Sequence, residues 1–313
     1  MTDASAGPGR HDRPPGSVTV VIPVRNGADV IHRQLDALSG QTFTGSWDVV
    51  VADNGSTDGT EALVRELLAS GQAIEYIRQP SNLGPTANFT TAGAAARGDY
   101  FMWYADDDWI PPEYVERCLA VHRAHPGAAL VAGVPRYGDP GTDGEPGVVL
   151  QITDPDPARR VAAYFRQVQD NGTFYGLIRT DALEATSPLM TRMGADWMFV
   201  AELAALGPIR TAETTTIWRD FDPGYTWRRM AKSGGLTWFE GRLPYVAIMG
   251  LAARTIAVGS PVFRTLGARR HLLAARAATI VFRRFVITGL RWRSLRRRMR
   301  NTMQRLSART RRA

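Results

Sequence analysis

Residues 81–114 have the sequence SNLGPTANFTTAGAAARGDYFMWYADDDWIPPEY, which contains a helix, a strand and an acidic turn. The alanine-rich stretch 86–97 predicts a helix, because alanine has the highest helix propensity. The apolar run Tyr100–Ala105 predicts a buried strand, because it is short and rich in aromatic residues. Three acids follow it directly: Asp106, Asp107 and Asp108. A helix that leads into a buried strand with a polar end is typical of an α/β sheet.

Two earlier apolar runs repeat this alternation. They are Val18–Val24 (VTVVIPV) and Trp47–Ala52 (WDVVVA), and helical spacing follows each of them, at Asp29–Leu38 and Gly59–Leu68. We expect Ser56 or Thr57 to cap the second helix. Strands that alternate with helices predict an α/β layer with a mostly parallel sheet.

The second half of the chain continues with both kinds of element. We expect helices at Pro112–His122, Pro157–Gln169 and Met190–Leu206, strands at Ala128–Val134 and Pro208–Ala212, and an exposed loop at 138–147.

The formal net charge of +8 hides a strong asymmetry. Residues 241–313 contain eighteen arginines and no lysine, aspartate or glutamate, whereas the first 240 residues hold all thirty acids. Such a cationic segment indicates an anionic partner, either a membrane surface or nucleic acid. Arg269, Arg276 and Arg283 recur every seven residues, which predicts a basic amphipathic helix suited to a membrane interface. The segment Leu243–Phe263 carries Arg254 at its middle, so a membrane-spanning helix is not favoured there.

The sequence predicts three regions. We expect a disordered tail at 1–16, a catalytic domain at 17–240 (with halves at 17–135 and 136–240), and a helical extension at 241–313. The tail is polar and lacks the apolar core of a secretory signal, and the single cysteine, Cys118, forms no intramolecular disulfide. We therefore expect a cytoplasmic protein, attached peripherally to the inner face of the cell membrane.

The polar residues after each strand are the candidates for chemistry, because ligands of open α/β sheets bind beyond the carboxyl ends of the strands. Adjacent carboxylates repel each other, and a divalent cation bound with substrate phosphates relieves this repulsion at Asp106–Asp108. The alternative there is a solvated turn before the next helix. Asp53, after the second strand, is equally compatible with a ligand contact and with a structural Asx turn.

These motifs together resemble family 2 glycosyltransferases of the GT-A fold. The resemblance rests on VTVVIPVRNG, VVVADNGSTDGT and the stretch 81–114, and it extends from about Ser17 to about Phe221. It implies a Rossmann-like, mixed and mostly parallel nucleotide-binding sheet with flanking helices, here followed by the basic helical extension.

The resemblance also implies a donor site. The residues that it assigns to the nucleotide are Pro23, Val24, Asn26, Asp53, Asp106 and Asp107, and Asp108 is its candidate ligand for Mg²⁺ or Mn²⁺. Asp53 is expected to accept a hydrogen bond from the ring of uracil or thymine. The family often has an Asp-x-Asp-Asp pattern, whereas Ala105 stands here at the first position, which leaves the division of roles among the acids open.

The segment MGADWMFVAELAALG at 193–207 resembles the region of the family that carries the catalytic base, which makes Asp196 the candidate. The alternative role for Asp196 is a helix N-cap. Tyr175 and Gly176 resemble the acceptor-side loop or are packing residues, and Arg219 contacts the diphosphate or is an ordinary surface arginine. His122 shows no metal-ligand spacing and is expected at the surface.

The sequence thus predicts an inverting, metal-dependent hexosyltransferase that uses a UDP- or dTDP-sugar and a glycan or lipid-linked acceptor, with nucleic acid not expected as a partner. One alternative is a nucleotidyltransferase-like enzyme, although residues 23–29 (PVRNGAD) are a poor triphosphate loop. The other is a non-catalytic nucleotide-binding protein with an anion-binding tail.

Overall fold

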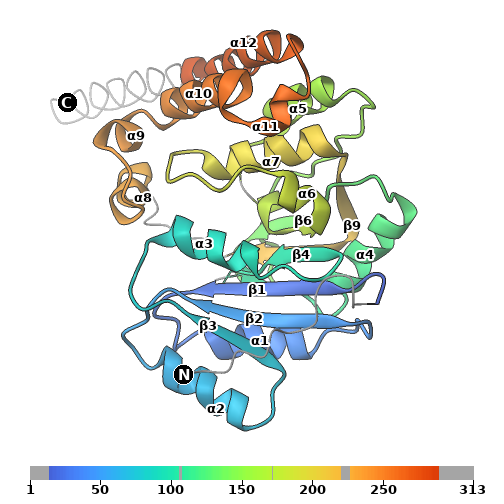
Figure 1. Cartoon of the computed structure of the whole chain (residues 1–313), viewed down its shortest axis with the longest axis vertical. Helices are drawn as coiled ribbons and strands as arrows, with labels where there is room; N and C mark the ends of the chain where they lie inside the picture. The colour runs from blue at the N-terminus through green and yellow to red at the C-terminus, as the bar shows by residue number, and fades with distance from the viewer. Residues whose placement is uncertain (1–13, 106–107, 171, 220–225, 289–313) are drawn as a thin grey trace, which may run out of the picture.

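The computed structural model describes residues 14–105, 108–170, 172–219 and 226–288 (Figure 1). One sheet of nine strands runs through it in the order β3-β2-β1-β4-β8-β6-β9-β5, and β7 pairs with β6. The strands are β1 (Val18–Val24), β2 (Trp47–Asp53), β3 (Ile74–Arg78), β4 (Tyr100–Trp103), β5 (Asp108–Trp109), β6 (Leu130–Tyr137), β7 (Glu145–Pro146), β8 (Leu177–Arg179) and β9 (Ile209–Arg219).

The first four strands form a parallel block. β1 pairs in parallel with both β2 and β4, and β2 pairs with β3. All seven residues of β1 are buried, as expected for the centre of a parallel sheet that is covered on both faces. The predicted mostly parallel α/β sheet is therefore confirmed, although the strand Ile74–Arg78 was not foreseen.

Helices of the first half cover the two faces of this block. They are α1 (Ile31–Ser39), α2 (Thr60–Ala69), α3 (Pro85–Ala94) and α4 (Tyr114–Ala124). The predicted cap of α2 is wrong, because Gly59 is the N-cap residue and the Ser56 side chain bonds to Asp53 instead. His122 on α4 is buried, with Nε2 at 2.9 Å from the Leu177 carbonyl, so its expected surface position is also wrong.

The second half of the sheet mixes strand directions. β8 runs antiparallel to β4 and β6, whereas β6 and β9 are parallel with a register shift between Gly133 and Val134. β9 extends to Arg219, well beyond the predicted end at Ala212, and the predicted loop 138–147 contains β7. The remaining elements of this half are α5 (Pro157–Gln167), a 3₁₀ turn (Gly172–Tyr175), α6 (Thr180–Ala185) and α7 (Ala195–Leu206).

The C-terminal helices pack on α5 and α7 and belong to the same hydrophobic core (Figure 1). They are α8 (Trp227–Ser233), α9 (Trp238–Arg242), α10 (Pro244–Arg254), a π-helical turn (Thr255–Gly259), α11 (Pro261–Arg264), α12 (Arg269–Val281) and a second π-helical turn (Phe282–Ile287). The boundary at residue 240 stays a prediction.

The amphipathic helix predicted around Arg269–Arg283 is present as α12, but its apolar face lies inside the protein. Leu273, Ala277 and Val281 are buried, so they are not available to a membrane. The segment from Leu243 to Phe263 is divided among α10, a π-helical turn and α11. No helix of the described residues is long and apolar enough to cross a bilayer. Residues 1–13 of the predicted tail 1–16 and residues 289–313 of the predicted extension 241–313 lie outside the described residues.

Candidate active site

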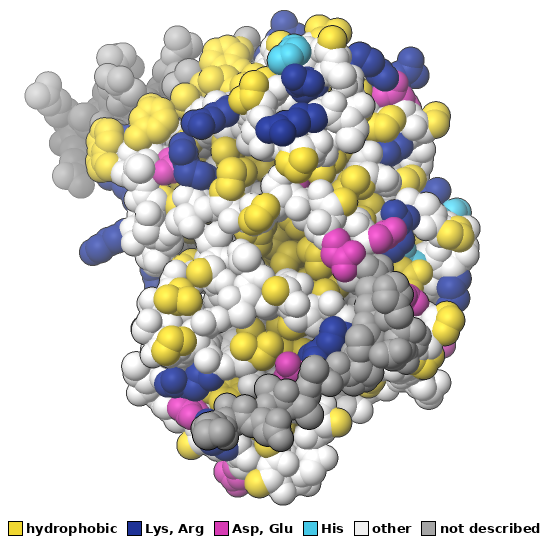
Figure 2. Space-filling view, viewed as in Figure 1, with side chains coloured by type: hydrophobic (Ala, Val, Ile, Leu, Met, Phe, Trp, Pro, Cys, Tyr) yellow, Lys and Arg dark blue, Asp and Glu magenta, His cyan; other side chains and the backbone are white. Residues whose placement is uncertain are grey.

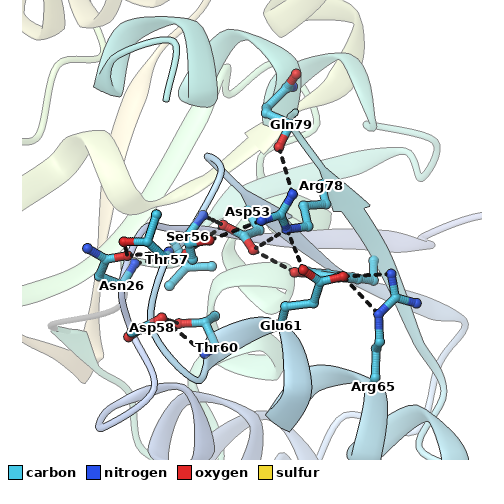
Figure 3. A network of polar contacts seen from close by, with 12 residues as sticks. Asn26, Asp53, Ser56, Thr57, Asp58, Thr60, Glu61, Arg65, Arg78 and Gln79 are labelled. Carbon is cyan, nitrogen blue, oxygen red and sulfur yellow. Dashed lines mark hydrogen bonds and ion pairs between the residues drawn. The ribbon is translucent and has the colours of Figure 1, made fainter. Parts of the chain in front are cut away.

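Asp53, the last residue of β2, is completely buried and holds the turn that follows it. Its Oδ1 accepts hydrogen bonds from the Ser56 amide at 2.8 Å and the Ser56 hydroxyl at 2.6 Å (Figure 3). Its Oδ2 accepts one from the Tyr76 hydroxyl at 2.5 Å. The Asx-type turn that the sequence left open is therefore formed. A carboxylate has about four acceptor positions, so these bonds leave capacity for a ligand once the site opens.

Arg78 balances the buried charge of Asp53. Its Nε lies 3.6 Å from Asp53 Oδ2 and 2.9 Å from Glu61 Oε2 (Figure 3). Burial raises the pKa of Tyr76, and its bond to Asp53 raises that pKa further. Tyr76 therefore remains a protonated donor to the carboxylate at neutral pH.

The loop after β1 is attached to the loop after β2. Asn26 has a φ of 55°, the left-handed conformation that asparagine tolerates better than most residues. Its amide donates to Ser56 Oγ at 2.9 Å, and its Oδ1 accepts from the Thr57 amide at 2.9 Å. Pro23 and Val24 are the buried last residues of β1 beside the end of β2. The structure thus brings these three predicted residues together with Asp53.

Sequence reasoning missed a set of asparagines that holds the next loop. Asn54 Nδ2 donates to Asn82 Oδ1 and to the Gly84 carbonyl, each at 3.0 Å, and its Oδ1 accepts from the Leu83 amide at 2.8 Å. Asn88 Nδ2 donates to a β2 carbonyl at 3.0 Å. The signal for them was the pair of turn sequences Asn-Gly and Ser-Asn-Leu-Gly, at 54–55 and 81–84.

Asp108 forms a buried ion pair with Arg219. The two residues face each other where β5 pairs with β9, and Arg219 Nε donates to Asp108 Oδ1 at 2.9 Å. The guanidinium also lies over the Tyr175 ring, 4.1 Å from its centroid. Burial lowers the pKa of Arg219, but the charge of Asp108, the nearby Tyr175 and Tyr137 and the hydrogen bond to Asp108 together raise it above its usual value. Arg219 is therefore no surface residue, and its contact with a diphosphate stays a prediction.

The described residues alone do not make up a metal site. A hard divalent cation takes several oxygen ligands, and these residues hold no group of three or more His, Cys, Asp or Glu side chains placed to bind one. Asp106 and Asp107 lie outside the described residues, and Arg219 already balances the charge of Asp108. The nucleotide role of Asp106 and Asp107 and the metal role of Asp108 stay predictions.

A cluster of aromatic rings joins β4 to α7. Trp103, at the end of β4, stacks on Phe174 with ring centroids 4.8 Å apart, and both rings contact Phe199 of α7. Phe174 also contacts Tyr175, whose ring carries the Arg219 guanidinium. The cluster therefore fixes α7 relative to the strand that precedes the acidic triplet.

Asp196 lies in the first turn of α7 and is half-buried. Gly194, with a φ of 82°, is the N-cap residue, so the capping role considered for Asp196 is wrong. The Oδ1 of Asp196 accepts a hydrogen bond from the Trp197 amide at 3.0 Å. Its assignment as the base stays a prediction.

The turn that leads into α7 is held from the C-terminal helices. Glu240 Oε1 accepts bonds from Arg192 Nε at 2.8 Å and from the Met193 amide at 3.0 Å. Although burial opposes it, these bonds and two from Thr237 lower the pKa of Glu240 to about 2. A Cβ on Gly194 would lie 2.6 Å from Ile248 Cγ1, so α10 also packs tightly against this turn.

The polar loops after β1, β2 and β4 leave the sheet at one edge, because these strands are parallel neighbours. The chain runs from β1 to β2 and β3 on one side and then returns to place β4 on the other. Such a reversal is the point at which open α/β sheets bind ligands. The predicted donor residues after β1 and β2 gather beside it.

Residues 19–186 match the family model described as glycosyl transferase family 2. This match covers more than half of the chain. The chain belongs to this family. The family predicted from the sequence is therefore confirmed, and the match supports neither the nucleotidyltransferase nor the non-catalytic binding protein.

Curated relatives of this glycosyltransferase match over its N-terminal motifs. It is 33% identical over 99 residues to glycosyltransferase GlyA of Streptococcus pneumoniae, which covers 32% of this chain and 14% of GlyA. It is 35% identical over 127 residues to the pre-mycofactocin glycosyltransferase of Mycobacterium tuberculosis, which covers 39% of this chain and 25% of the relative. The chain thus matches only a small part of the length of these relatives.

Solved structures show the same fold at low sequence identity. S. aureus TarS 1–349 superposes with a TM-score of 0.57 and 17% identity, covering 87% of this chain and 74% of TarS. The mannosyltransferase PcManGT of Pyrobaculum calidifontis, in complex with GDP-Man and Mn²⁺, gives a TM-score of 0.54 and 20% identity, covering 89% and 76%. These similarities confirm the GT-A fold of the glycosyltransferase.

Proposed function

We propose that this glycosyltransferase is a hexosyltransferase that transfers a sugar, with inversion, from a UDP- or dTDP-sugar to a hydroxyl group of a lipid-linked or cell-envelope glycan. The observation that carries the donor assignment is the buried Asp53 at the end of β2, joined through Ser56 to the loop of Asn26. A carboxylate there accepts a hydrogen bond from the N3–H of uracil or thymine. Cytosine has no N3–H in its neutral form, so the site favours the first two bases.

Because the Asp53 side chain has no exposed surface, the base reaches it only when the Tyr76 hydroxyl moves aside. Tyr76 lies on the edge strand β3 and is half-buried, so one side of its ring faces solvent and not the core. The proposed donor site therefore opens on binding of the nucleotide.

In the proposed reaction, the Asp196 carboxylate takes the proton of the acceptor hydroxyl while that oxygen bonds to the sugar C1. The bond between C1 and the diphosphate oxygen breaks, and the nucleoside diphosphate leaves from the opposite face. The acidic triplet Asp106–Asp108 is proposed to hold Mg²⁺ or Mn²⁺, which offsets the negative charge of the leaving diphosphate. The Arg219 pair is then what keeps Asp108 at the donor edge of the sheet.

Membrane attachment is also part of the proposal. The arginine-rich segment 241–313 has no acid, and anionic headgroups attract such segments. Acceptors carried on lipids are found at this surface, so attachment brings the enzyme to them.

A thermal-shift screen of UDP, dTDP and GDP, each with Mn²⁺ or with a chelator, tests the donor assignment. A ligand at 100 times its dissociation constant stabilises the protein by about 2.7 kcal/mol, which raises the melting temperature measurably. We expect stabilisation by UDP or dTDP that needs the metal. GDP is included because PcManGT was solved with GDP-Man, whereas S. aureus TarS was solved with UDP-GlcNAc. Stabilisation by GDP alone would overturn the proposed donor.

NMR of the product formed from an α-linked UDP-sugar tests the stereochemistry. A β-linked product supports inversion, and an α-linked product overturns it.

A further inference from the structure

The short helix α9 presents an apolar face to solvent. Trp238 is 78% exposed, and Phe239 and Leu243 are also exposed. Leu243 is the C-cap residue directly after α9, and its amide donates to the Phe239 carbonyl at 2.9 Å. The opposite side of α9 packs against the protein, because Glu240 and Gly241 are buried and Gly241 packs on Ala231 of α8. These three residues, Trp238, Phe239 and Leu243, are called the α9 face below.

The surroundings of the α9 face are cationic. Arg228, Lys232 and Arg242 are exposed, and the Arg242 guanidinium lies 5.9 Å from the centroid of a Trp238 ring. Across described residues 226–288 the one acid is Glu240, which is buried and paired with Arg192. Figure 2 shows hydrophobic side chains gathered at the upper left of the molecule, over α9 and α10, with Lys and Arg side chains beside them.

We infer that the α9 face docks on an anionic lipid bilayer, with Trp238 and Phe239 inserted at the headgroup level. Aromatic residues are enriched at membrane interfaces, and basic residues beside them are attracted by anionic headgroups. A protein partner of mixed charge lacks this match, because described residues 226–288 offer cations without an exposed acid. The docking element is thus α9, not the apolar face of α12, which the core occupies.

A second exposed apolar residue, Leu272 on α12, does not form such a face. It is 76% exposed, but the neighbouring Leu273 is buried, and Arg269 nearby is paired with Asp156 of α5. Leu272 therefore serves as the matched control for an exposed apolar side chain on a basic helix.

Docking through α9 also orients the enzyme. Glu240, next to Phe239 in the sequence, bonds to the Met193 amide in the turn that leads to Asp196. The α9 face is therefore fixed relative to the proposed base. Resting on the proposed function, this places a lipid-linked acceptor on the membrane side of the enzyme near Asp196.

Fluorescent labelling of the full chain tests the docking. Cys118 is completely buried, so a cysteine introduced as Phe239→Cys or Leu272→Cys is labelled selectively with an environment-sensitive dye. On vesicles of phosphatidylglycerol and phosphatidylcholine we expect a blue shift and quenching by lipid-borne quenchers for the label at 239 and no change for the label at 272. A shift at 272 but not at 239, or no shift at either, would overturn the inference.

A second measurement uses Trp238→Ala/Phe239→Ala against Leu272→Ala at 0.5 M salt, where the attraction between charges is screened. Losing two inserted aromatic rings is expected to weaken vesicle binding by about 10- to 100-fold, with no loss for the control. Equal binding by both variants would overturn docking, as would sedimentation showing that the α9 face holds two copies of the chain together. UDP binding by the same variants separates this outcome from a failure of the proposed donor.

Discussion

The Arg219 guanidinium donates to the Asp108 carboxylate at 2.9 Å and joins the last strand of the sheet to the acidic triplet after β4. Both side chains are buried, and Gln34 Nε2 additionally holds the Asp108 carbonyl at 2.9 Å. The pair spans 111 residues of sequence. The position of Asp108 after β4 therefore depends on β9, a strand from the second half of the chain.

Replacing Arg219 by Met is expected to destabilise the protein by about 3–5 kcal/mol, because it leaves a buried carboxylate without its cation. Urea unfolding measures the difference. Arg65→Met is the matched control, since its exposed pair with Glu61 is expected to contribute less than about 1 kcal/mol. Equal losses for the two variants would contradict a special role for the buried pair.

Asp108→Asn keeps the shape of the side chain and a hydrogen bond to Arg219 but removes the charge. If Asp108 contacts the metal, UDP binding measured by calorimetry becomes insensitive to Mn²⁺. Chelation of the metal should lower UDP binding by the unaltered protein to the level of this variant. Added Mn²⁺ or Mg²⁺ should then restore the transfer activity of the unaltered protein. A variant whose UDP binding responds to Mn²⁺ like the unaltered protein would leave Asp108 with the structural pair alone.

Asp53→Asn is expected to weaken UDP binding by about tenfold or more, because a charged acceptor for the base is lost. Tyr76→Phe removes the hydroxyl that bonds to Asp53 but leaves the carboxylate in place. We expect this control to bind UDP at least as tightly as the unaltered protein in calorimetry. Unchanged binding by Asp53→Asn would mean that the carboxylate serves only the turn.

Asp196→Asn should lower turnover by about 10²- to 10⁴-fold, since the amide cannot accept the proton of the acceptor. Its melting temperature and UDP affinity should stay unchanged. Asp181→Asn, at the exposed first turn of α6, is the control and should turn over normally. Near-normal turnover of Asp196→Asn would remove it as the base.

His122 predicts a pH dependence of stability. Burial lowers its pKa to about 4 from an unfolded value of 6.5. Between these values the unfolded chain binds more protons, so stability is lost as the pH falls from 6.5 towards 4, by about 2 kcal/mol at pH 5. The His122→Gln variant should lose less stability over this range in thermal unfolding, whereas the exposed His125→Gln should follow the unaltered protein. Identical slopes for all three proteins would contradict this.

Local sequence patterns were sufficient to predict the family, three of the four parallel strands and the polar residues at their ends. These features depend on local patterns: β1 and β2 are apolar runs followed by turn residues, and their positions match the structure within one residue. Weak local patterns failed, as with β3, none of whose five residues is fully buried, and with β9, which extends through polar residues to Arg219.

Only the tertiary structure decided which charges are paired and which apolar faces are covered. His122 was assigned to the surface, and the role of Arg219 was left open. Neither residue's sequence neighbours reveal the distant strand that buries it. The apolar side of the predicted basic helix was assigned to a membrane interface, but α12 packs against α5 and α10, so this side lies in the core. Local patterns fix how a segment folds, whereas burial depends on contacts between segments that are far apart in the chain.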